Sequence, residues 1–311
     1  MDKNLKTAKI AVAMGGPGSE HEVSMASGKA VLDALRDAGC NAVELIVTNH
    51  AICAPGDVDV VFNTIHGTFG EDGDLQKILD KQGVNYTGAG AISSELAFDK
   101  ILSKKKFIEA GVPTPISEMV DCADGLVMPE MDLPYVVKPP REGSSVGVHI
   151  CRTSDEAKTA MEDAMKFSND VLVEQFVEGK ELTVGVLDGE ALPVVHIAPR
   201  SGFYNMSNKY PWLSTAGDGG TDYYCPADLS PEVTKMVQDA ALAAHQSLGI
   251  EVYSRVDVLL DEGGKPFVLE ANTIPGMTES SLLPKSAKAA GYEFAELCMK
   301  IIELSMDTHR G

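Results

Sequence analysis

Arg255, Asp257, Glu270 and Asn272 form the part of this sequence best suited to bind a metal ion beside phosphate groups. Two carboxylates and an amide are the hard oxygen ligands that Mg²⁺ prefers, together with water and substrate phosphates. All four residues alternate with apolar residues along two strand-like segments, which an Asp-Glu-Gly-Gly turn separates. Pairing symmetric about that turn places position 255 opposite position 270. We therefore expect a magnesium or manganese site on one face of a β-hairpin.

This face is expected to include Leu259 on the first strand and Val268 on the second, because side chains separated by two residues share a face. The alternative is a surface salt bridge between Arg255 and Glu270. The flanking residues Val256, Val258, Phe267 and Leu269 are apolar and typical of a core. They favour a cluster that points into the protein.

Two lysines could supply positive charge to bound phosphates. Lys138 ends the strand-like segment 135–138 and precedes a Gly- and Ser-rich loop, 139–147, whose backbone N–H groups could hold phosphate. Lys100 offers a second cation. The sequence contains no G-x-x-x-x-G-K-[ST] motif, and the Gly88-Ala89-Gly90 turn lacks the third glycine of a dinucleotide fingerprint. A nicotinamide-dependent oxidoreductase is therefore disfavoured, and any nucleotide must bind in another fold.

The elements expected to position these residues begin as a parallel α/β unit. Strand-like runs at 9–14, 43–47 and 58–65 alternate with a helical pattern that ends at Gly39. Such alternation predicts a parallel sheet covered by helices, with ligands at the carboxyl ends of the strands. The loops that begin at Gly15 and His66 should lie at that edge.

The remainder mixes helices and strands less regularly. Residues 199–222 are irregular enough to indicate a lid, a binding loop or disorder. We predict helices at 98–110, 155–167 and 231–248, and further strands at 171–177, 181–187 and 192–198.

Composition excludes several functions. The chain has 26 basic and 46 acidic residues, a net charge of −20, which disfavours nucleic-acid binding. No apolar stretch is long enough to span a membrane and the amino terminus is polar. The six cysteines form no C-x-x-C pair and are expected to be reduced thiols. We therefore expect a cytoplasmic protein with no membrane partner.

A series of short motifs places the chain in a family context. They are Gly15-Gly16, Glu20-His21-Glu22-Val23-Ser24, His66-Gly67, Gly70-Glu71-Asp72-Gly73, Tyr86-Thr87-Gly88, Asp99-Lys100, Val137-Lys138-Pro139, Arg141 to Gly147, Glu174 with Glu181, Lys209-Tyr210, Tyr224 to Ala227, Arg255-Val256-Asp257, Leu269 to Thr273, Pro275 to Thr278 and Ser281-Leu282. In this order they resemble the D-alanine–D-alanine ligases of the ATP-grasp superfamily.

The resemblance implies an α/β fold, α+β in its ATP-grasp part, with three units. These are an amino-terminal parallel α/β domain, 1–96, a central subdomain, 97–182, and a carboxy-terminal subdomain, 183–311, with a lid loop at 200–224. It also implies the reaction: ATP and two D-alanines give D-alanyl-D-alanine, ADP and phosphate through an acyl phosphate, for peptidoglycan synthesis. The family is commonly homodimeric through the amino-terminal domain.

The resemblance assigns residues to ATP and to Mg²⁺ or Mn²⁺, two ions in the family. The two lysines would bind phosphates, Glu181 the ribose, and Glu174 the adenine amino group. Gln175, which replaces a lysine of many relatives, and Val177 would contact the base. The implied ATP ligands are Lys100, Lys138, Glu174, Gln175, Val177 and Glu181, and the implied metal ligands are Asp257, Glu270 and Asn272.

The resemblance also assigns residues to D-alanine. Glu22 would bind the ammonium of the first D-alanine, although an acidic residue in a first helical turn also suits the helix dipole. Ser144 and Tyr210 would hydrogen-bond with Glu22 and fasten the lid. The other implied residues are His66 at the first carboxylate, Arg255 and the Gly276 N–H at the oxyanion, and Ser281, the Leu282 N–H and Lys209 at the second carboxylate.

Two alternatives remain within this resemblance. The second substrate could be D-lactate or D-serine, although the Lys209-Tyr210 pair resembles the D-alanine type. The loop after Tyr210 is longer than in many relatives, which bears on lid closure. The chain could also be a catalytically silent ATP-grasp scaffold, although the metal carboxylates and Arg255 are present.

Overall fold

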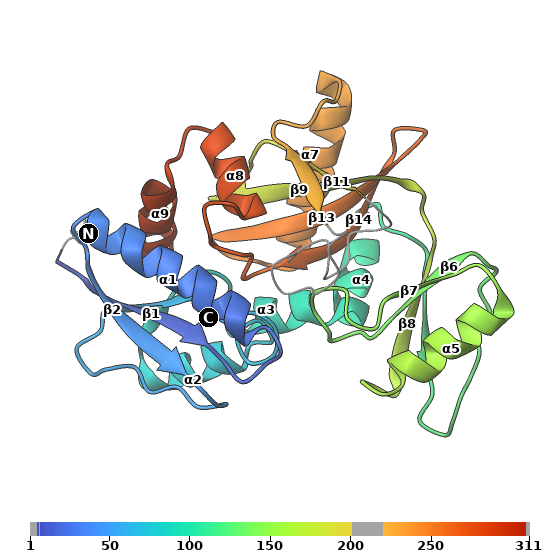
Figure 1. The fold of residues 1–311 in the computed structure, drawn as a ribbon, viewed down its shortest axis with the longest axis horizontal. Helices are drawn as coiled ribbons and strands as arrows, with labels where there is room; N and C mark the ends of the chain where they lie inside the picture. Colours follow the sequence, from blue (N-terminus) through green and yellow to red (C-terminus); the bar gives the residue numbers. More distant parts are fainter. Residues whose placement is uncertain (1–4, 6, 201–219, 309–311) are drawn as a thin grey trace.

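Three β-sheets and the helices around them make up the chain (Figure 1). The structure is a computed structural model that describes residue 5 and residues 7–200 and 220–308. Among these described residues no helix is both long and apolar enough to cross a membrane. All six cysteines are free, as expected.

The first sheet is parallel, as the sequence pattern predicts. Its strands lie in the order β2-β1-β3-β4, and α1 packs on β1. Gly39, at φ 82°, follows α1 in the left-handed conformation typical of a residue just beyond a helix. The elements are β1 (Lys9–Gly15), α1 (His21–Asp37), β2 (Asn41–Val47), β3 (Val60–Asn63), α2 (Asp74–Gln82) and β4 (Asn85–Tyr86).

The second sheet is antiparallel, in the order β5-β8-β6-β7, with α5 packed on one side. A capping box between Thr153 and Glu156 begins α5 one residue before the predicted start. The elements are β5 (Ser117–Asp121), β6 (Tyr135–Lys138), β7 (His149–Cys151), α5 (Ser154–Ala164) and β8 (Asp170–Gln175).

The third sheet is also antiparallel, in the order β12-β11-β9-β13-β14, with β10 paired to β9. Helix α7 (Pro231–Ser247) packs on it over an apolar core that includes Val184, Val256 and Ala241. The strands are β9 (Gly179–Leu187), β10 (Glu190–Ala191), β11 (Val195–Pro199), β12 (Thr221–Tyr224), β13 (Tyr253–Asp261) and β14 (Pro266–Asn272).

Four further helices connect these layers. The predicted helix 98–110 corresponds to α4 (Lys100–Glu109), which Asp99 caps and separates from a preceding helix, α3 (Ala91–Phe98). Helices α8 (Leu282–Ala289) and α9 (Phe294–Asp307) return to the first sheet, where Ile301 shares a core with Leu35. The predicted three-unit division stays a prediction. Strand β9 crosses the predicted boundary between residues 182 and 183, and helices α8 and α9 pack against the first unit.

The β13–β14 hairpin has a register that differs from the prediction. Asp257 pairs with Glu270 and Arg255 with Asn272, whereas symmetric pairing had set 255 opposite 270. The pairing shifts between Asp257 and Val258, because Leu269 is one extra residue in β14. This bulge also turns Val268 into the core, so its predicted place beside Glu270 was wrong.

Candidate active site

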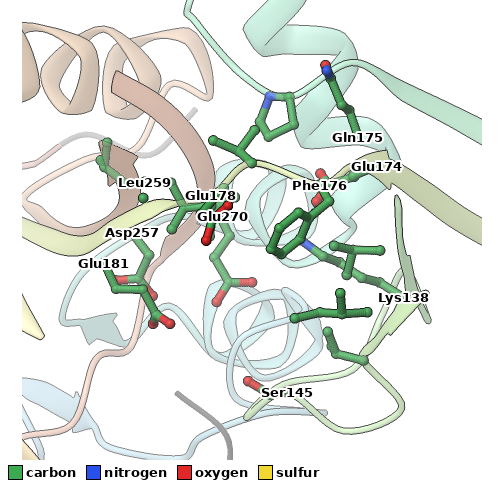
Figure 2. Close-up of a pocket in the computed structure, with 18 of the residues that line it drawn as sticks. Lys138, Ser145, Glu174, Gln175, Phe176, Glu178, Glu181, Asp257, Leu259 and Glu270 are labelled. Atoms are coloured by element: carbon green, nitrogen blue, oxygen red, sulfur yellow. The ribbon is translucent and has the colours of Figure 1, made fainter. Parts of the chain in front are cut away.

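A cavity of about 590 Å³ lies between the second and third sheets, a volume within the usual range for small-molecule sites. Lys138, Glu174 and Gln175 line it from the second sheet, and Glu181 and Asp257 from the third. Figure 2 shows Glu181, Asp257 and Glu270 on one side of the cavity, with Lys138 and Phe176 on the other. Val177 and Lys100 also line this cavity. The predicted nucleotide-binding residues therefore share one space.

Glu174 lies between two lysines at the inner end of this cavity. It is 2% exposed; Lys104 Nζ lies 2.5 Å from its Oε1, and Lys138 Nζ donates to its Oε2. Burial raises the pKa of Glu174, but the two ammonium groups outweigh it and lower the pKa to about 2. Each carboxylate oxygen therefore faces a lysine ammonium, and Glu174 also lines the cavity. A carboxylate at this wall is suited to accept from a donor on a bound ligand, such as the amino group of adenine.

Lys104 was not predicted as a site residue. Its side chain is 3% exposed, and burial lowers the pKa of its ammonium. It follows Lys100 by four residues, which is about one turn of α4, so both side chains lie on one side of that helix. In the sequence, this four-residue spacing from Lys100 is the one pattern that could have indicated Lys104 as a site residue.

Lys100 joins the Gly- and Ser-rich loop to the metal-ligand candidates. Its Nζ donates to the Glu142 carbonyl oxygen at 2.7 Å and lies 3.2 Å from Glu270 Oε2. Asp99 caps α4 by accepting from the N–H groups of Ile101 and Leu102. The cap fixes the start of the helix, and with it the Lys100 ammonium at the cavity.

The predicted metal ligands are neighbours across the hairpin. Asp257 accepts from Arg255 Nε at 3.1 Å and Nη2 at 2.9 Å, and from Thr183 Oγ1 at 2.6 Å. Asn272 Nδ2 lies 3.2 Å from Asp257 Oδ2. The described residues contain no group of three His, Cys, Asp or Glu side chains placed to hold a metal. Two carboxylates and an amide with nearby cations instead fit a hard ion that takes further oxygens from phosphate and water.

A second cavity, of about 290 Å³, adjoins this hairpin. Arg255, Asn272 and Glu270 line one wall, and Glu270 also lines the first cavity. The opposite wall carries carboxylates from the first domain, and one end is formed by the residues that precede α8. The predicted residues that line it are His66, Ser144, Arg255, Glu270, Asn272, Gly276, Ser281 and Leu282.

Glu20 lines this second cavity beside Glu71 and Glu270, whereas Glu22, the residue predicted there, does not. Glu20 is 9% exposed and accepts from Ser144 Oγ, whereas Glu22 is an exposed residue in the first turn of α1. A Cβ atom added to Gly67 or Gly143 would lie 2.8 Å or 2.9 Å from Glu20 Oε2. The helix-dipole alternative fits Glu22. The sequence offered two glutamates two positions apart, and only the contacts distinguish them.

His66 is held by three elements around the second cavity. Its Nε2 lies 3.1 Å from Ser27 Oγ, and its Nδ1 lies 2.8 Å from the Ile274 carbonyl oxygen and 3.5 Å from Glu71 Oε1. Burial lowers the pKa of His66, but the Glu71 and Glu20 carboxylates outweigh it and raise the pKa. Glu71 was not predicted as a site residue, although it belongs to the motif after His66.

Ser281 is the residue immediately before α8, and its hydroxyl contacts the turn that leads into the helix. Its Oγ lies 3.1 Å from the Thr278 nitrogen, and a Cβ on Gly276 would come within 2.9 Å of that oxygen. The Gly276 backbone can therefore approach closely. The N–H groups at the start of α8, that of Leu282 included, are suited to a carboxylate. Lys209 and Tyr210 lie outside the described residues.

Comparison with known families gives two matches. The family model described as D-ala D-ala ligase C-terminus matches residues 118–303, and the model described as D-ala D-ala ligase N-terminus matches residues 46–89. Among curated relatives, the D-alanine–D-alanine ligase of Methylacidiphilum infernorum is 47% identical over 95% of both chains. That of Citrifermentans bemidjiense is 42% identical over 97% of both.

Solved structures agree with these matches. The D-alanine–D-alanine ligase of Bacillus anthracis superposes with a TM-score of 0.84 at 32% identity, over 96% of this chain and 97% of that one. Its complex with ATP gives a TM-score of 0.83. The VanG D-Ala:D-Ser ligase of Enterococcus faecalis gives 0.80 at 27% identity, over 96% of this chain and 99% of that one. The overall fold is thus shared by ligases with different second substrates.

Proposed function

Because the chain belongs to the D-alanine–D-alanine ligase family, we propose that it joins two D-alanines into D-alanyl-D-alanine with conversion of ATP to ADP and phosphate. The product supplies peptidoglycan synthesis. The observation that carries the proposal is the position of Glu270 in the wall shared by two cavities, one suited to a nucleotide and one to amino acids.

In the larger cavity, Lys100 and Lys138 would hold the ATP phosphates, and Glu181 the ribose hydroxyls. Glu174 would accept from the adenine amino group, while Gln175 and Val177 contact the base. The position of Glu174 and Gln175 together in the lining of this cavity supports this orientation. Compact ammonium charges near the transferred oxygens stabilise the charge that develops on them.

Asp257, Glu270 and Asn272 would hold Mg²⁺ or Mn²⁺, as a pair of ions. When bound, these ions neutralise phosphate charge and align the phosphate groups. Asp257 and Glu270 pair directly across β13 and β14, which keeps their carboxylates together. Lys100 and Arg255, already within reach of these carboxylates, add positive charge to the same region.

In the first half-reaction, the carboxylate of the first D-alanine attacks the γ-phosphorus of ATP. The bond to the ADP oxygen breaks, and an acyl phosphate forms. Glu20, in place of Glu22, would bind the substrate ammonium, because a buried carboxylate there is suited to a buried cation. Ser144 would orient Glu20, with Tyr210 as a further partner, and His66 would lie near the substrate carboxylate.

In the second half-reaction, the amine of the second D-alanine attacks the acyl carbon. Arg255 and the Gly276 N–H would stabilise the tetrahedral oxyanion, and phosphate then leaves. Ser281, the Leu282 N–H and Lys209 would bind the carboxylate of this second substrate. The predicted lid would keep water from the acyl phosphate, although Thr221–Tyr224 at its end form β12 of the third sheet and residues 201–219 lie outside the described residues.

A coupled assay of ADP release, with chromatography of the product, tests the proposal. D-Alanine alone should give ADP and D-alanyl-D-alanine in equal amounts. Turnover only with D-alanine plus D-lactate or D-serine would assign the alternative substrates. ATP binding without turnover on any of these would assign the silent scaffold.

We also propose a homodimer that acts in the cytoplasm without a nucleic-acid or membrane partner. The six free thiols are consistent with a reducing compartment. Light scattering after size-exclusion chromatography should give twice the monomer mass of 33.1 kDa. A monomer mass would contradict the dimer and leave the ligase proposal untouched.

A further inference from the structure

We propose that Lys104 is a positioning residue of the nucleotide site, which keeps Lys138 available for phosphate and braces Glu174 against the third sheet. This inference rests on the proposed role of the larger cavity as an ATP site. Lys104 itself does not belong to the residues that line that cavity, so its effect must pass through Glu174.

Lys104 changes the balance of charge around Glu174. Glu174 carries one negative charge between two ammonium groups, one on each carboxylate oxygen. With Lys138 alone, the pair would be neutral, and the carboxylate would compete with phosphate for the Lys138 ammonium. Lys104 supplies a second positive charge from the protein interior. The three groups together keep a net charge of +1, and of the two lysines Lys138 is the one that lines the cavity.

Lys104 also connects the second sheet to the third. Lys104 Nζ donates to Thr114 Oγ1, and Thr114 Oγ1 donates to the Val268 carbonyl oxygen at 2.7 Å. The Val268 N–H donates to the Pro113 carbonyl oxygen at 2.8 Å. A continuous polar path therefore joins Glu174 on β8 to the backbone of β14, the strand that carries Glu270.

The position of α4 explains why this path exists. The helix lies between the lobe of β6, β7 and β8 and the sheet of β13 and β14 (Figure 1). Its Lys100 reaches Glu270 and its Lys104 reaches Glu174, one turn apart. One rigid helix thus sets the distance between Glu174, the proposed acceptor for the base, and Glu270, the carboxylate beside the proposed phosphate site.

Lys104→Met tests the proposal against Lys106→Met as the matched control. Lys106 is a half-buried residue of the same helix, and its ammonium pairs with Glu109. Calorimetric titration with ATP and with ITP, which has an oxo group in place of the 6-amino group, measures affinity and base preference without requiring turnover. ADP-release assays then give KM for ATP and for D-alanine separately.

We expect Lys104→Met to weaken ATP binding at least tenfold and to reduce the ATP-to-ITP preference. The KM for D-alanine should change less than twofold, and Lys106→Met should match the wild type throughout. Thr114→Val, which breaks only the link to β14, should weaken ATP binding by a smaller factor. Unchanged ATP affinity and base preference in folded Lys104→Met would overturn the proposal.

Loss of Lys104 leaves Glu174 with one counter-charge, so the single variant could unfold. The double variant Lys104→Met/Glu174→Gln removes that imbalance, and it should fold but lack the preference for ATP over ITP. A folded double variant with wild-type preference would also overturn the inference. Wild-type protein that binds ATP but forms no dipeptide would contradict the proposed function instead, and leave the Lys104 result interpretable.

Discussion

Glu20 and Glu22 are two residues apart but have different environments. The Glu20 carboxylate is enclosed by Gly67, Gly143 and Ser144, whereas Glu22 faces solvent on α1. Gly67 and Gly143 make room for this carboxylate, because a Cβ atom at either position would come within 2.9 Å of Glu20 Oε2. The local contacts of each glutamate therefore decide which carboxylate can bind a substrate ammonium.

Glu20→Gln should lower kcat/KM for D-alanine at least about 30-fold, because removing one partner of a buried charge pair costs about 2–5 kcal/mol. Glu22→Gln is the matched control and should retain wild-type kinetics. Steady-state ADP release measures both variants. Equal losses in the two variants, or a loss only in Glu22→Gln, would show that Glu20 has been assigned wrongly.

Glu270→Ala should reduce Mg²⁺-dependent turnover at least about 100-fold, since even residues that only support metal ligands cost 10–100-fold. Glu262→Ala, in the exposed turn of the same hairpin, removes an acidic residue away from both cavities and should keep activity. Titration of Mg²⁺ or Mn²⁺ at saturating ATP checks the prediction. Near-normal turnover of Glu270→Ala would remove this residue from the metal site.

At the scale of elements, α7 contributes a buried histidine to the third sheet. His245 is 4% exposed, and its Nδ1 lies 2.8 Å from Ser254 Oγ on β13. Burial disfavours the imidazolium and lowers the pKa of His245 to about 4. The packing of α7 therefore depends on a neutral imidazole.

Because the folded pKa of His245 lies below its ordinary value, the unfolded chain binds a proton more readily as the pH falls from about 6.5 toward 4. The associated stability is complete above that window and is lost within it. For this residue the loss between about pH 7.5 and about pH 5 is roughly 2 kcal/mol. Between these two pH values the free energy of unfolding of His245→Gln should therefore fall by roughly 2 kcal/mol less than that of the wild type. Urea unfolding at both pH values measures it, and equal losses in wild type and variant would exclude His245 as the source.

At the scale of the whole molecule, the chain returns from the third sheet to the first. Gly88, at φ 83°, follows the last strand of the first sheet, and its N–H donates to Ser305 Oγ on α9 at 3.1 Å. A Cβ at Gly88 would lie 3.1 Å from Cε1 of Tyr253, a fully buried residue of β13. One glycine thus allows the close contact of the first and third sheets.

Gly88→Ala should destabilise the protein by about 1–3 kcal/mol more than Gly83→Ala, because it adds overpacking to the cost of a left-handed alanine. Gly83 has φ 68° and nothing within 4 Å of an added Cβ, so it isolates the backbone term of roughly 1–2 kcal/mol. Chemical denaturation gives both free energies of unfolding. Similar free energies of unfolding for the two variants would mean that Tyr253 moves aside without an energetic cost.

Local patterns in the sequence were sufficient for much of the fold and for the types of site residue. The parallel sheet, the Gly39 helix end and the acidic hairpin follow from periodicity and turn residues, and the structure contains them. The predicted nucleotide residues share a cavity because β6, β8, β9 and the start of α4 all border the space between the second and third sheets. Their roles toward ATP and D-alanine stay predictions.

Contacts between distant segments required the tertiary structure. The extra residue at Leu269, the choice of Glu20 over Glu22, and the burial of Lys104 against Glu174 all depend on which elements pack together. Periodicity reports which side of its own helix or strand a residue occupies. It carries no information on the neighbour across the interface, because that neighbour is selected by packing and charge balance among segments up to hundreds of residues apart.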